Sequence, residues 1–232
     1  MAEIVISEFM DRGAIDEILG GRDVLYDPNL VDDRDSLMSA VADAAALIVR
    51  NRTRVDAPLL QAGPRLEVVG RLGVGLDNID LEACESRGVT VCPATGANDT
   101  AVAEYVIGAA LILLRGAWFG SERVAAGEWP RGDLIGREAS KKRIGLVGFG
   151  SIARETARRA LALGMVAVAF DPYVGADAAA AHGVELLDLD TLLATSDVVS
   201  LHVPLTPETR GLIDAAALAR MKQAAILINA AR

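Results

Sequence analysis

Short apolar runs alternate with amphipathic segments along the whole chain, and β-branched residues dominate the runs. Segments between the runs often begin at Asp and end at Gly, as in "DAPLLQAG", which is typical of helices. This alternation predicts parallel strands covered on both faces by helices. In the first half of the chain, the predicted strands are residues 3–7, 23–27, 46–50, 66–72 and 89–94.

A second series of strands follows the basic loop "SKKR". Before that loop, the segment "NDTAVAEYVIGAALILLRGAWFGSERVAAG" is apolar on nearly every face, which predicts a helix packed on several sides between two domains. Asn98 or Asp99 is expected to cap its start. We therefore expect two doubly wound α/β domains with parallel sheets, residues 1–98 and 99–232. The predicted strands of the second domain are residues 144–150, 165–171, 184–186, 197–203 and 224–230.

Composition narrows the class of protein. Hydrophobic residues make up 52% of the chain but aromatic residues only 4%, so the core must consist of Ala, Val, Leu and Ile, as suits buried parallel strands. The formal charge of −9 argues against a nucleic-acid partner. The run "AVAEYVIGAALILL" is short and contains Glu104, which favours a buried helix over a membrane span. Cys84 and Cys92 lack metal-ligand spacing, which favours reduced thiols in a cytoplasmic protein without a metal site.

The stretch "GLVGFGSIA" is a candidate dinucleotide-binding turn. A glycine-rich turn alone is weak evidence, but this one follows an apolar strand, opens a helix, and precedes Asp171 by about 20 residues. Gly148 permits the tight turn, Gly150 lets the backbone approach a pyrophosphate, and Ala153 allows close helix packing. Asp171 can accept hydrogen bonds from the ribose hydroxyls and would repel a 2′-phosphate, which favours NAD over NADP. The alternative is that Asp171 only caps a turn.

Six motifs in order resemble the D-isomer-specific 2-hydroxyacid dehydrogenase family. The resemblance implies a flavodoxin-like substrate domain, a Rossmann NAD-binding domain, a substrate held between them, and a homodimer. It rests on "GRLGVGLDNIDLEA" (70–83), "PATGANDTAVAEY" (93–105), "GLVGFGSIA", "FDPY", "SLHVPLTPETRGLID" (200–214) and "MKQAAILINAAR" (221–232).

The same resemblance assigns site residues. Backbone N–H groups around Val74 and Gly75 would hold the substrate carboxylate, although an ordinary tight turn is the alternative. Arg232 would be catalytic, since a guanidinium can bind that carboxylate through paired hydrogen bonds and polarise the reacting carbonyl. The implied cofactor contacts are Thr100 (for which helix capping is the alternative), Gly148, Phe149, Gly150, Ser151, Ile152, Asp171, His202, Val203, Pro204, Thr209, Ala230 and Ala231.

Neither histidine is expected to act as the catalytic base. His202 would lie at a strand end on the cofactor side, and His182 at a helix C-terminus. In the family the catalytic glutamate and histidine follow the arginine, whereas this sequence ends at Arg232. We therefore expect the second domain to stop after its fifth strand and these 232 residues to be inactive by themselves.

The loop "IVRNRTRV" bears on the substrate. It is either a solvated basic loop or a site at the carboxyl end of a strand, where Arg50, Asn51 and Arg52 bind a second anionic group. This loop resembles its counterpart in D-3-phosphoglycerate dehydrogenases, as do "FDPYV" and "HGVELLDLDTLL". The combination of "SEFMD", "VRNRTRV", "GRLGVGLDNID" and "PATGAND" is more similar to family members that act on 3-sulfolactate. Tyr105 replaces a histidine common in the D-3-phosphoglycerate dehydrogenases. We expect interconversion of 3-sulfolactate and 3-sulfopyruvate; the alternatives are D-3-phosphoglycerate oxidation and a non-catalytic NAD-binding sensor or corepressor.

Overall fold

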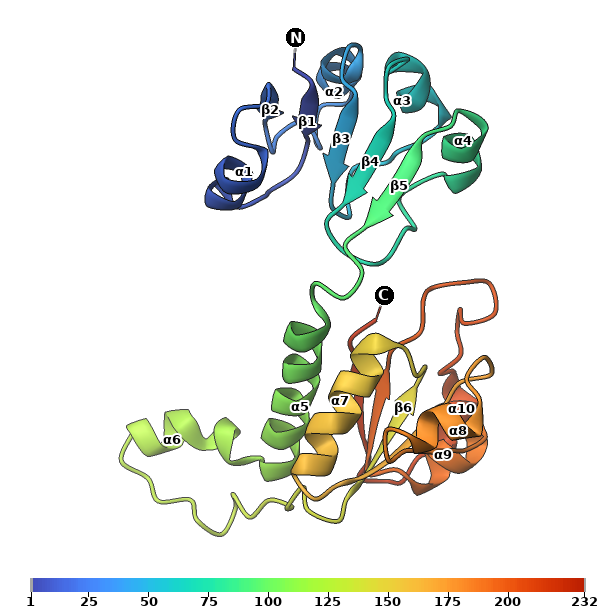
Figure 1. The fold of residues 1–232 in the computed structure, drawn as a ribbon. Coiled ribbons are helices and arrows are strands. Elements are labelled where there is room, and N and C mark those ends of the chain that lie inside the picture. Colours follow the sequence, from blue (N-terminus) through green and yellow to red (C-terminus); the bar gives the residue numbers. More distant parts are fainter. Residues whose placement is uncertain (1, 232) are drawn as a thin grey trace. The chain divides into compact units, whose positions relative to one another are not determined.

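The computed structural model describes residues 2–231, which form two compact units divided between Ala97 and Asn98. Each unit contains a five-stranded sheet in which every strand pairing is parallel. Helices pack on both faces of each sheet (Figure 1). The prediction of two doubly wound α/β domains is therefore confirmed.

The first unit has the strand order β2-β1-β3-β4-β5, which is the flavodoxin-like order. Ile15 of α1 packs against Ile4 and Ile6 on one face, while the larger core, which includes Leu47 and Leu59, lies under α2, α3 and α4. An aspartate caps the start of each of these helices. The elements are β1 (Ile4–Ile6), α1 (Arg12–Leu19), β2 (Val24–Tyr26), α2 (Arg34–Val41), β3 (Ala46–Val49), α3 (Ala57–Ala62), β4 (Val68–Arg71), α4 (Leu81–Ser86) and β5 (Thr90–Pro93), and the caps are Asp11, Asp33, Asp56 and Asp80.

The second unit has the strand order β10-β9-β6-β7-β8, the Rossmann arrangement through its fifth strand. Side chains alternate across its sheet: Leu146 faces the core that α5 and α7 cover, and Val147 faces the core that α9 and α10 cover. The elements are α5 (Asp99–Arg115), β6 (Arg143–Val147), α7 (Ser151–Ala162), β7 (Val166–Phe170), α8 (Ala176–Ala180), β8 (Glu185–Leu186), α9 (Leu189–Thr195), β9 (Val198–Leu201), α10 (Ala215–Arg220) and β10 (Ile226–Asn229).

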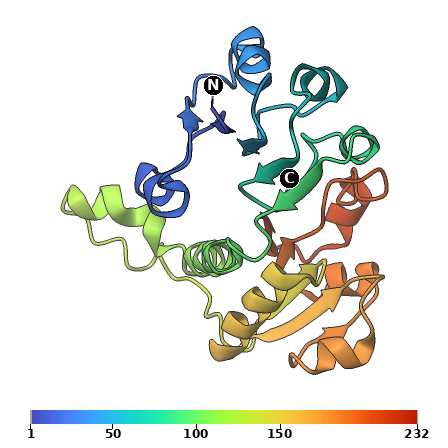
Figure 2. The same cartoon turned by 45° about the horizontal axis from the view of Figure 1, so that its top comes forward.

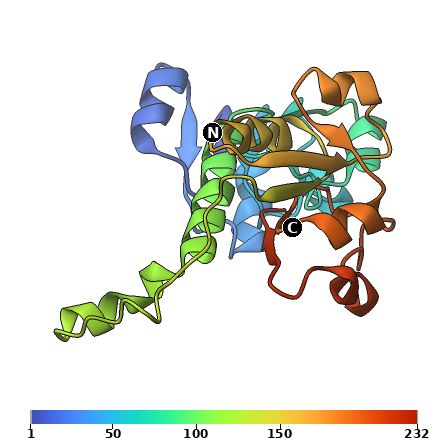
Figure 3. The same ribbon diagram turned by 90° about the horizontal axis from the view of Figure 1, so that it is seen from below.

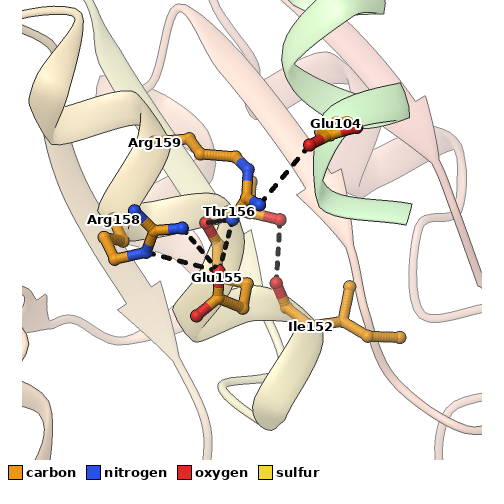
Figure 4. Close-up of polar contacts among 6 residues, drawn as sticks. All are labelled: Glu104, Ile152, Glu155, Thr156, Arg158 and Arg159. Carbon is orange, nitrogen blue, oxygen red and sulfur yellow. Dashed lines mark hydrogen bonds and ion pairs between the residues drawn. The ribbon is translucent and has the colours of Figure 1, made fainter. Parts of the chain in front are cut away.

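Helix α5 packs along α7, as Figure 2 shows. An ion-pair network joins them: Arg159 of α7 pairs with Glu155 of its own helix and, at 3.6 Å, with Glu104 of α5 (Figure 4). Arg158 binds the same Glu155 at 2.9 Å from the solvent side. Thr156, buried beside them, donates its hydroxyl to the Ile152 carbonyl at 2.9 Å.

Two expectations for α5 were wrong. The helix buries a single stripe, because Ala103, Val106, Ile107, Ala110 and Leu114 recur at helical spacing, whereas Tyr105, Ile112 and Leu113 are exposed. Neither Asn98 nor Asp99 makes a capping hydrogen bond. Asn98 is at φ −111° and ψ 6° instead of in the extended conformation that capping requires, and one buried side-chain oxygen of each residue lacks a partner in the described chain.

After α5 the chain forms η1 (Ala117–Gly120) and α6 (Ser121–Ala125), then an irregular segment up to β6. This arm extends away from the sheet of the second unit (Figures 1 and 3). Its exposed side chains include Trp118, Phe119 and Trp129. Within residues 2–231 no single helix has the length and hydropathy to cross a membrane; Asp99–Arg115 and Ala117–Ala125 reach that level together, across a 63° bend, by length and composition alone.

Candidate functional site: a nucleotide crevice and an arginine loop

The candidate cofactor site lies where the strand order of the second unit reverses. β6 pairs with β7 on one side and with β9 on the other, so the loops that leave β6 and β9 run in opposite directions. Such a switch point leaves a crevice at the carboxyl ends of the strands, which is where open α/β sheets bind nucleotides. Gly148, Asp171 and His202 directly follow β6, β7 and β9, so the fold brings these predicted residues to one edge.

The turn after β6 requires glycine at Gly148. Its φ is +90°, and a Cβ there would lie 2.9 Å from the carbonyl oxygen of His202. At Gly150, by contrast, a Cβ would meet nothing within 4 Å. At Gly148 the protein's own backbone therefore leaves no room for a side chain. Gly150 leaves open space in front of a helix, as a bound pyrophosphate needs.

Helix α7 begins at this open space. Gly150 is its N-cap residue and has no side chain that could cap it. The first helical hydrogen bond runs from Arg154 N to Gly150 O, so the preceding N–H groups of Ser151 and Ile152 belong to the unpaired first turn. Together with the helix dipole, such N–H groups bind anions. These residues fit the pyrophosphate of a dinucleotide.

Asp171 joins the end of β7 to the glycine turn. One carboxylate oxygen accepts a hydrogen bond from Phe149 N at 2.8 Å, and the other accepts one from Tyr173 N at 2.8 Å. Each carboxylate oxygen has a second lone pair, so Asp171 keeps acceptor capacity for ribose hydroxyls. The ring of Phe149 is fully buried, 5.9 Å edge-on from His182. Phe149 can therefore contact a cofactor only through its backbone.

His202 has a half-buried, neutral imidazole. Burial lowers its pKa to about 4, and its Nε2 atom is buried without a partner in the described chain. Its backbone N–H donates to Val147 O at 2.7 Å, which holds the loop after β9 against the end of β6. These features make His202 part of the wall of the crevice.

The loop after β9 supplies further predicted contacts. Val203, Pro204, Thr209 and Ala231 all line one mostly apolar groove beside the ends of β9 and β10. Residues 207–211 of this loop form a turn. Thr209 Oγ1 fixes that turn by accepting from Thr206 N at 2.8 Å and donating to Pro204 O, and Gly211 at φ +72° ends it.

The remaining cofactor predictions fall at element ends. Thr100 is exposed in the first turn of α5, and Ala230 follows β10 and packs against the core of the second unit. Arg232 lies outside the described residues, so its role stays a prediction. Among residues 2–231 no three His, Cys, Asp or Glu side chains are grouped so that they could hold a metal ion.

In the first unit, the turn at Val74 and Gly75 follows β4. Arg71, which is 5% exposed, donates from Nη1 to Leu72 O at 2.7 Å. A Cβ on Gly73, which has φ +146°, would fall 1.7 Å from the same nitrogen. A guanidinium therefore packs directly under the turn and requires glycine above it.

The arginine loop, residues 50–54, follows β3. Glu8, just after β1, accepts hydrogen bonds from the backbone N–H groups of Arg50 (2.8 Å), Asn51 (3.3 Å), Arg52 (3.2 Å to the nearer oxygen) and Thr53 (2.9 Å). Burial acts to raise the pKa of Glu8, but the hydrogen bonds from Thr53, Arg50 and Arg52 outweigh it and leave the pKa below its ordinary value. The carboxylate is thus ionised and holds the loop.

The side chains of the arginine loop point to different neighbours. The Arg50 guanidinium lies over the Phe9 ring, 6.0 Å from its centroid, and Arg52 forms an ion pair with Asp32. Arg50, Asn51, Arg52 and Arg54 are all exposed. On a chain with a net charge of −9, these side chains form a local basic surface at the carboxyl end of a strand.

Sequence reasoning missed the residues that support both sites. Glu8 and Asn78 hold the arginine loop, Arg71 supports the Val74–Gly75 turn, and Arg154 donates to the Phe149 carbonyl at 3.2 Å. Glu8 and Thr53 are 45 residues apart, so no local pattern connects them. The only signal was an acidic residue directly after an apolar strand.

Comparison with known proteins agrees with this geometry. Residues 107–232 match the family model described as "D-isomer specific 2-hydroxyacid dehydrogenase, NAD binding domain". The whole chain is 54% identical to (S)-sulfolactate dehydrogenase of Chromohalobacter salexigens, of which it covers 75%. Over 86% of its length it is 46% identical to D-3-phosphoglycerate dehydrogenase of Mycobacterium bovis, of which it covers 38%.

A solved structure supports the cofactor. D-lactate dehydrogenase from Aquifex aeolicus, complexed with NAD and lactic acid, aligns over 99% of this chain and 68% of its own, with a TM-score of 0.84 and 27% identity. The glycine turn, the open helix start and Asp171 fit the same cofactor, so the cofactor of the second unit is NAD. The chain belongs to the D-isomer specific 2-hydroxyacid dehydrogenase family.

Proposed function

We propose that the full-length protein is an NAD-dependent dehydrogenase that interconverts 3-sulfolactate and 3-sulfopyruvate. The observation that carries this proposal is the arginine loop, in which three exposed arginines follow β3 and Glu8 fixes the backbone. The 54% identity to a sulfolactate dehydrogenase supports it.

The substrate class follows from the number of anion sites. The turn at Val74 and Gly75, together with Arg232, accounts for the carboxylate of a 2-hydroxy acid. The arginine loop is then available for a second anionic group, and guanidinium groups suit sulfonate or phosphate oxygens. A three-carbon acid with a sulfonate on its third carbon has both groups.

We assign the following roles to the residues of this chain. Gly150, Ser151 and Ile152 bind the pyrophosphate of NAD, and Asp171 binds the ribose of its adenosine. Arg232 binds the substrate carboxylate and polarises the carbonyl. When bound, NAD supplies the hydride acceptor. In the family a histidine exchanges the hydroxyl proton and a glutamate orients its imidazole, and both follow the arginine in sequence.

Turnover assays with the full-length protein test the proposal. We expect kcat/KM for 3-sulfolactate to exceed that for lactate, and Arg52→Ala to lower only the former, by about 10- to 100-fold. Arg22→Ala is the matched control, since Arg22 is an exposed arginine of the same unit paired with Glu3. Preference for lactate or glyoxylate, unchanged by Arg52→Ala, would contradict the proposal.

Two alternatives remain distinguishable in the same assays. The 46% identity to D-3-phosphoglycerate dehydrogenase favours phosphoglycerate as a second candidate substrate, because phosphate would use the same arginines. A non-catalytic sensor would bind NAD but turn over neither acid. Turnover of 3-sulfolactate and of phosphoglycerate, together with a separate measurement of NAD binding, distinguishes the sulfolactate enzyme, the phosphoglycerate enzyme and the sensor.

We also propose that the protein is a cytoplasmic homodimer. Trp118 (70%), Phe119 (68%) and Trp129 (83%) are highly exposed on the arm after α5, and a second copy would remove them from water. Analytical ultracentrifugation should give a dimer that Trp129→Ser together with Phe119→Ser weakens. A monomeric wild-type protein at micromolar concentration would contradict this assignment.

A further inference from the structure

Glu8 is a buried carboxylate to which the proposed function assigns no contact with substrate or cofactor. It is 5% exposed and lies one residue from Ser7, whose hydroxyl is 3.0 Å from that of Thr53. Both oxygens of Glu8 accept backbone hydrogen bonds, and all of these donors come from the arginine loop. Burying a charge is costly unless it is paired or hydrogen-bonded, so this arrangement calls for a reason.

The hydrogen bonds determine the conformation of the loop. Successive N–H groups ordinarily point in different directions, and they converge on one anion only when the backbone curves around it as a nest. Charge-assisted hydrogen bonds are about twice as strong as neutral ones, so the ionised Glu8 selects this curved conformation. The anion bound by these amides is therefore Glu8, a residue of the same unit that lies 42 to 45 positions away from them in sequence.

This arrangement limits how the loop can bind anything else. The amides of residues 50–53 face Glu8, so an outside anion cannot use them. What the loop offers to a ligand is its side chains. Two of these are already oriented: Phe9, adjacent to Glu8, lies under the Arg50 guanidinium, and Asp32 pairs with Arg52.

Asn78 extends the link to the turn expected to hold the carboxylate. Its side-chain nitrogen donates to the carbonyls of Thr53 at 2.7 Å and Arg50 at 3.3 Å. Asn78 lies three residues after Gly75, and its own carbonyl accepts from Val55 N at 2.9 Å. Glu8 therefore fixes the loop by accepting from its backbone N–H groups, and Asn78 fixes it by donating to two of its backbone carbonyls.

We propose that Glu8 is a positioning residue that sets the distance between the two anion sites of the substrate by holding the arginine loop. This inference rests on the proposed function, because it assigns the arginine loop to the second anionic group. Glu8 does not touch the substrate in this scheme; it acts through Arg50, Asn51 and Arg52.

The test uses Glu8→Gln in the full-length protein, which keeps the size of the side chain but turns one acceptor into a donor that faces N–H groups. Glu8→Asp keeps the charge on a shorter side chain. Glu3→Gln is the control, since Glu3 precedes the same strand but is exposed and paired with Arg22. Two readouts are needed: KM and kcat with 3-sulfolactate and with lactate, and amide hydrogen exchange of residues 50–53 without ligands.

We expect Glu8→Gln to raise KM for 3-sulfolactate about tenfold or more and to leave KM for lactate and both kcat values within about twofold. The amides of residues 50–53 should exchange faster, Glu8→Asp should restore part of both effects, and Glu3→Gln should produce neither. If Glu8→Gln does not fold, Glu8→Asp replaces it in the test, and the quantity compared is the ratio of KM for 3-sulfolactate to KM for lactate.

Three results would overturn the inference. Unchanged exchange at residues 50–53 would show that Glu8 does not hold the loop. Faster exchange with an unchanged KM for 3-sulfolactate would show that the loop is not needed for the second anion. Equal losses with both acids would indicate a general structural role. Failure of the proposed function appears differently, as a wild-type protein that does not prefer 3-sulfolactate.

Discussion

The carboxylate of Asp171 and the backbone N–H of Phe149 are joined by a 2.8 Å hydrogen bond between the end of β7 and the glycine turn after β6. The residue expected to bind the ribose is therefore also part of the turn that admits the pyrophosphate. Loss of its carboxylate should affect both halves of the nucleotide site.

We expect Asp171→Ala to weaken NAD binding by about 10- to 100-fold, corresponding to one or two lost hydrogen bonds to a charged group. Discrimination against NADP should fall as well, because the repelling charge is gone. Fluorescence or calorimetric titration with both nucleotides measures this. Asp177→Ala, an exposed aspartate in α8, is the control, and equal affinities for wild type and Asp171→Ala would contradict the assignment.

The two glycines of the turn should respond differently to the same substitution. Gly148→Ala places a Cβ 2.9 Å from His202 O at φ +90°, so it should lower the free energy of unfolding by about 1–3 kcal/mol. Gly150→Ala meets open space and should change stability by less than about 1 kcal/mol. It should nevertheless weaken NAD binding, because the added methyl occupies the pyrophosphate position.

Urea unfolding and NAD titration of the Gly148 and Gly150 variants separate these effects. A Gly150→Ala protein with wild-type affinity for NAD would show that the pyrophosphate lies elsewhere.

His202 should contribute to pH-dependent stability. Burial depresses its pKa in the folded state from an ordinary value of 6.5 to about 4. The unfolded chain therefore binds a proton first as pH falls, so this contribution is fully present above pH 6.5 and is lost between pH 6.5 and about 4. The loss should reach about 3 kcal/mol.

Urea unfolding at a series of pH values tests the effect of His202. His202→Gln should flatten the decline over that range, while His182→Gln, which changes the other histidine, should not. An unaltered decline in His202→Gln would mean that other groups cause it.

The two arginines that bind Glu155 should differ in their effect on stability. Arg159 is 18% exposed and also pairs with Glu104 of α5, whereas Arg158 is 66% exposed (Figure 4). Arg159→Ala should cost about 1–2 kcal/mol through lost packing and pairing between the helices. Arg158→Ala should have a much smaller effect, because exposed ion pairs contribute little.

Thermal and urea unfolding of both variants provide the measurement. Equal effects of Arg158→Ala and Arg159→Ala would show that the link between α5 and α7 does not depend on Arg159.

Much of this protein could be predicted from local pattern. Apolar runs located the ten strands of residues 2–231, and central strands such as β1 and β6 are apolar throughout because both of their faces are buried. The glycine turn was recognisable because Gly148, Gly150 and Asp171 meet stereochemical demands at fixed spacing. The expectation that α5 would pack on several sides was wrong, because its buried residues form a single stripe at helical spacing.

The supporting residues depended on tertiary structure. Glu8 and the arginine loop come from different strand ends, and only the pairing of β1 with β3 brings them together. The packing of Arg71 under Gly73 and the unused caps at Asn98 and Asp99 likewise depend on neighbours that no local motif specifies. The sequence by itself determined the strands, the cofactor turn and the family, because short-range sterics and burial leave a local pattern; the tertiary structure decided which buried charges hold the loops, because those contacts join residues far apart in the chain.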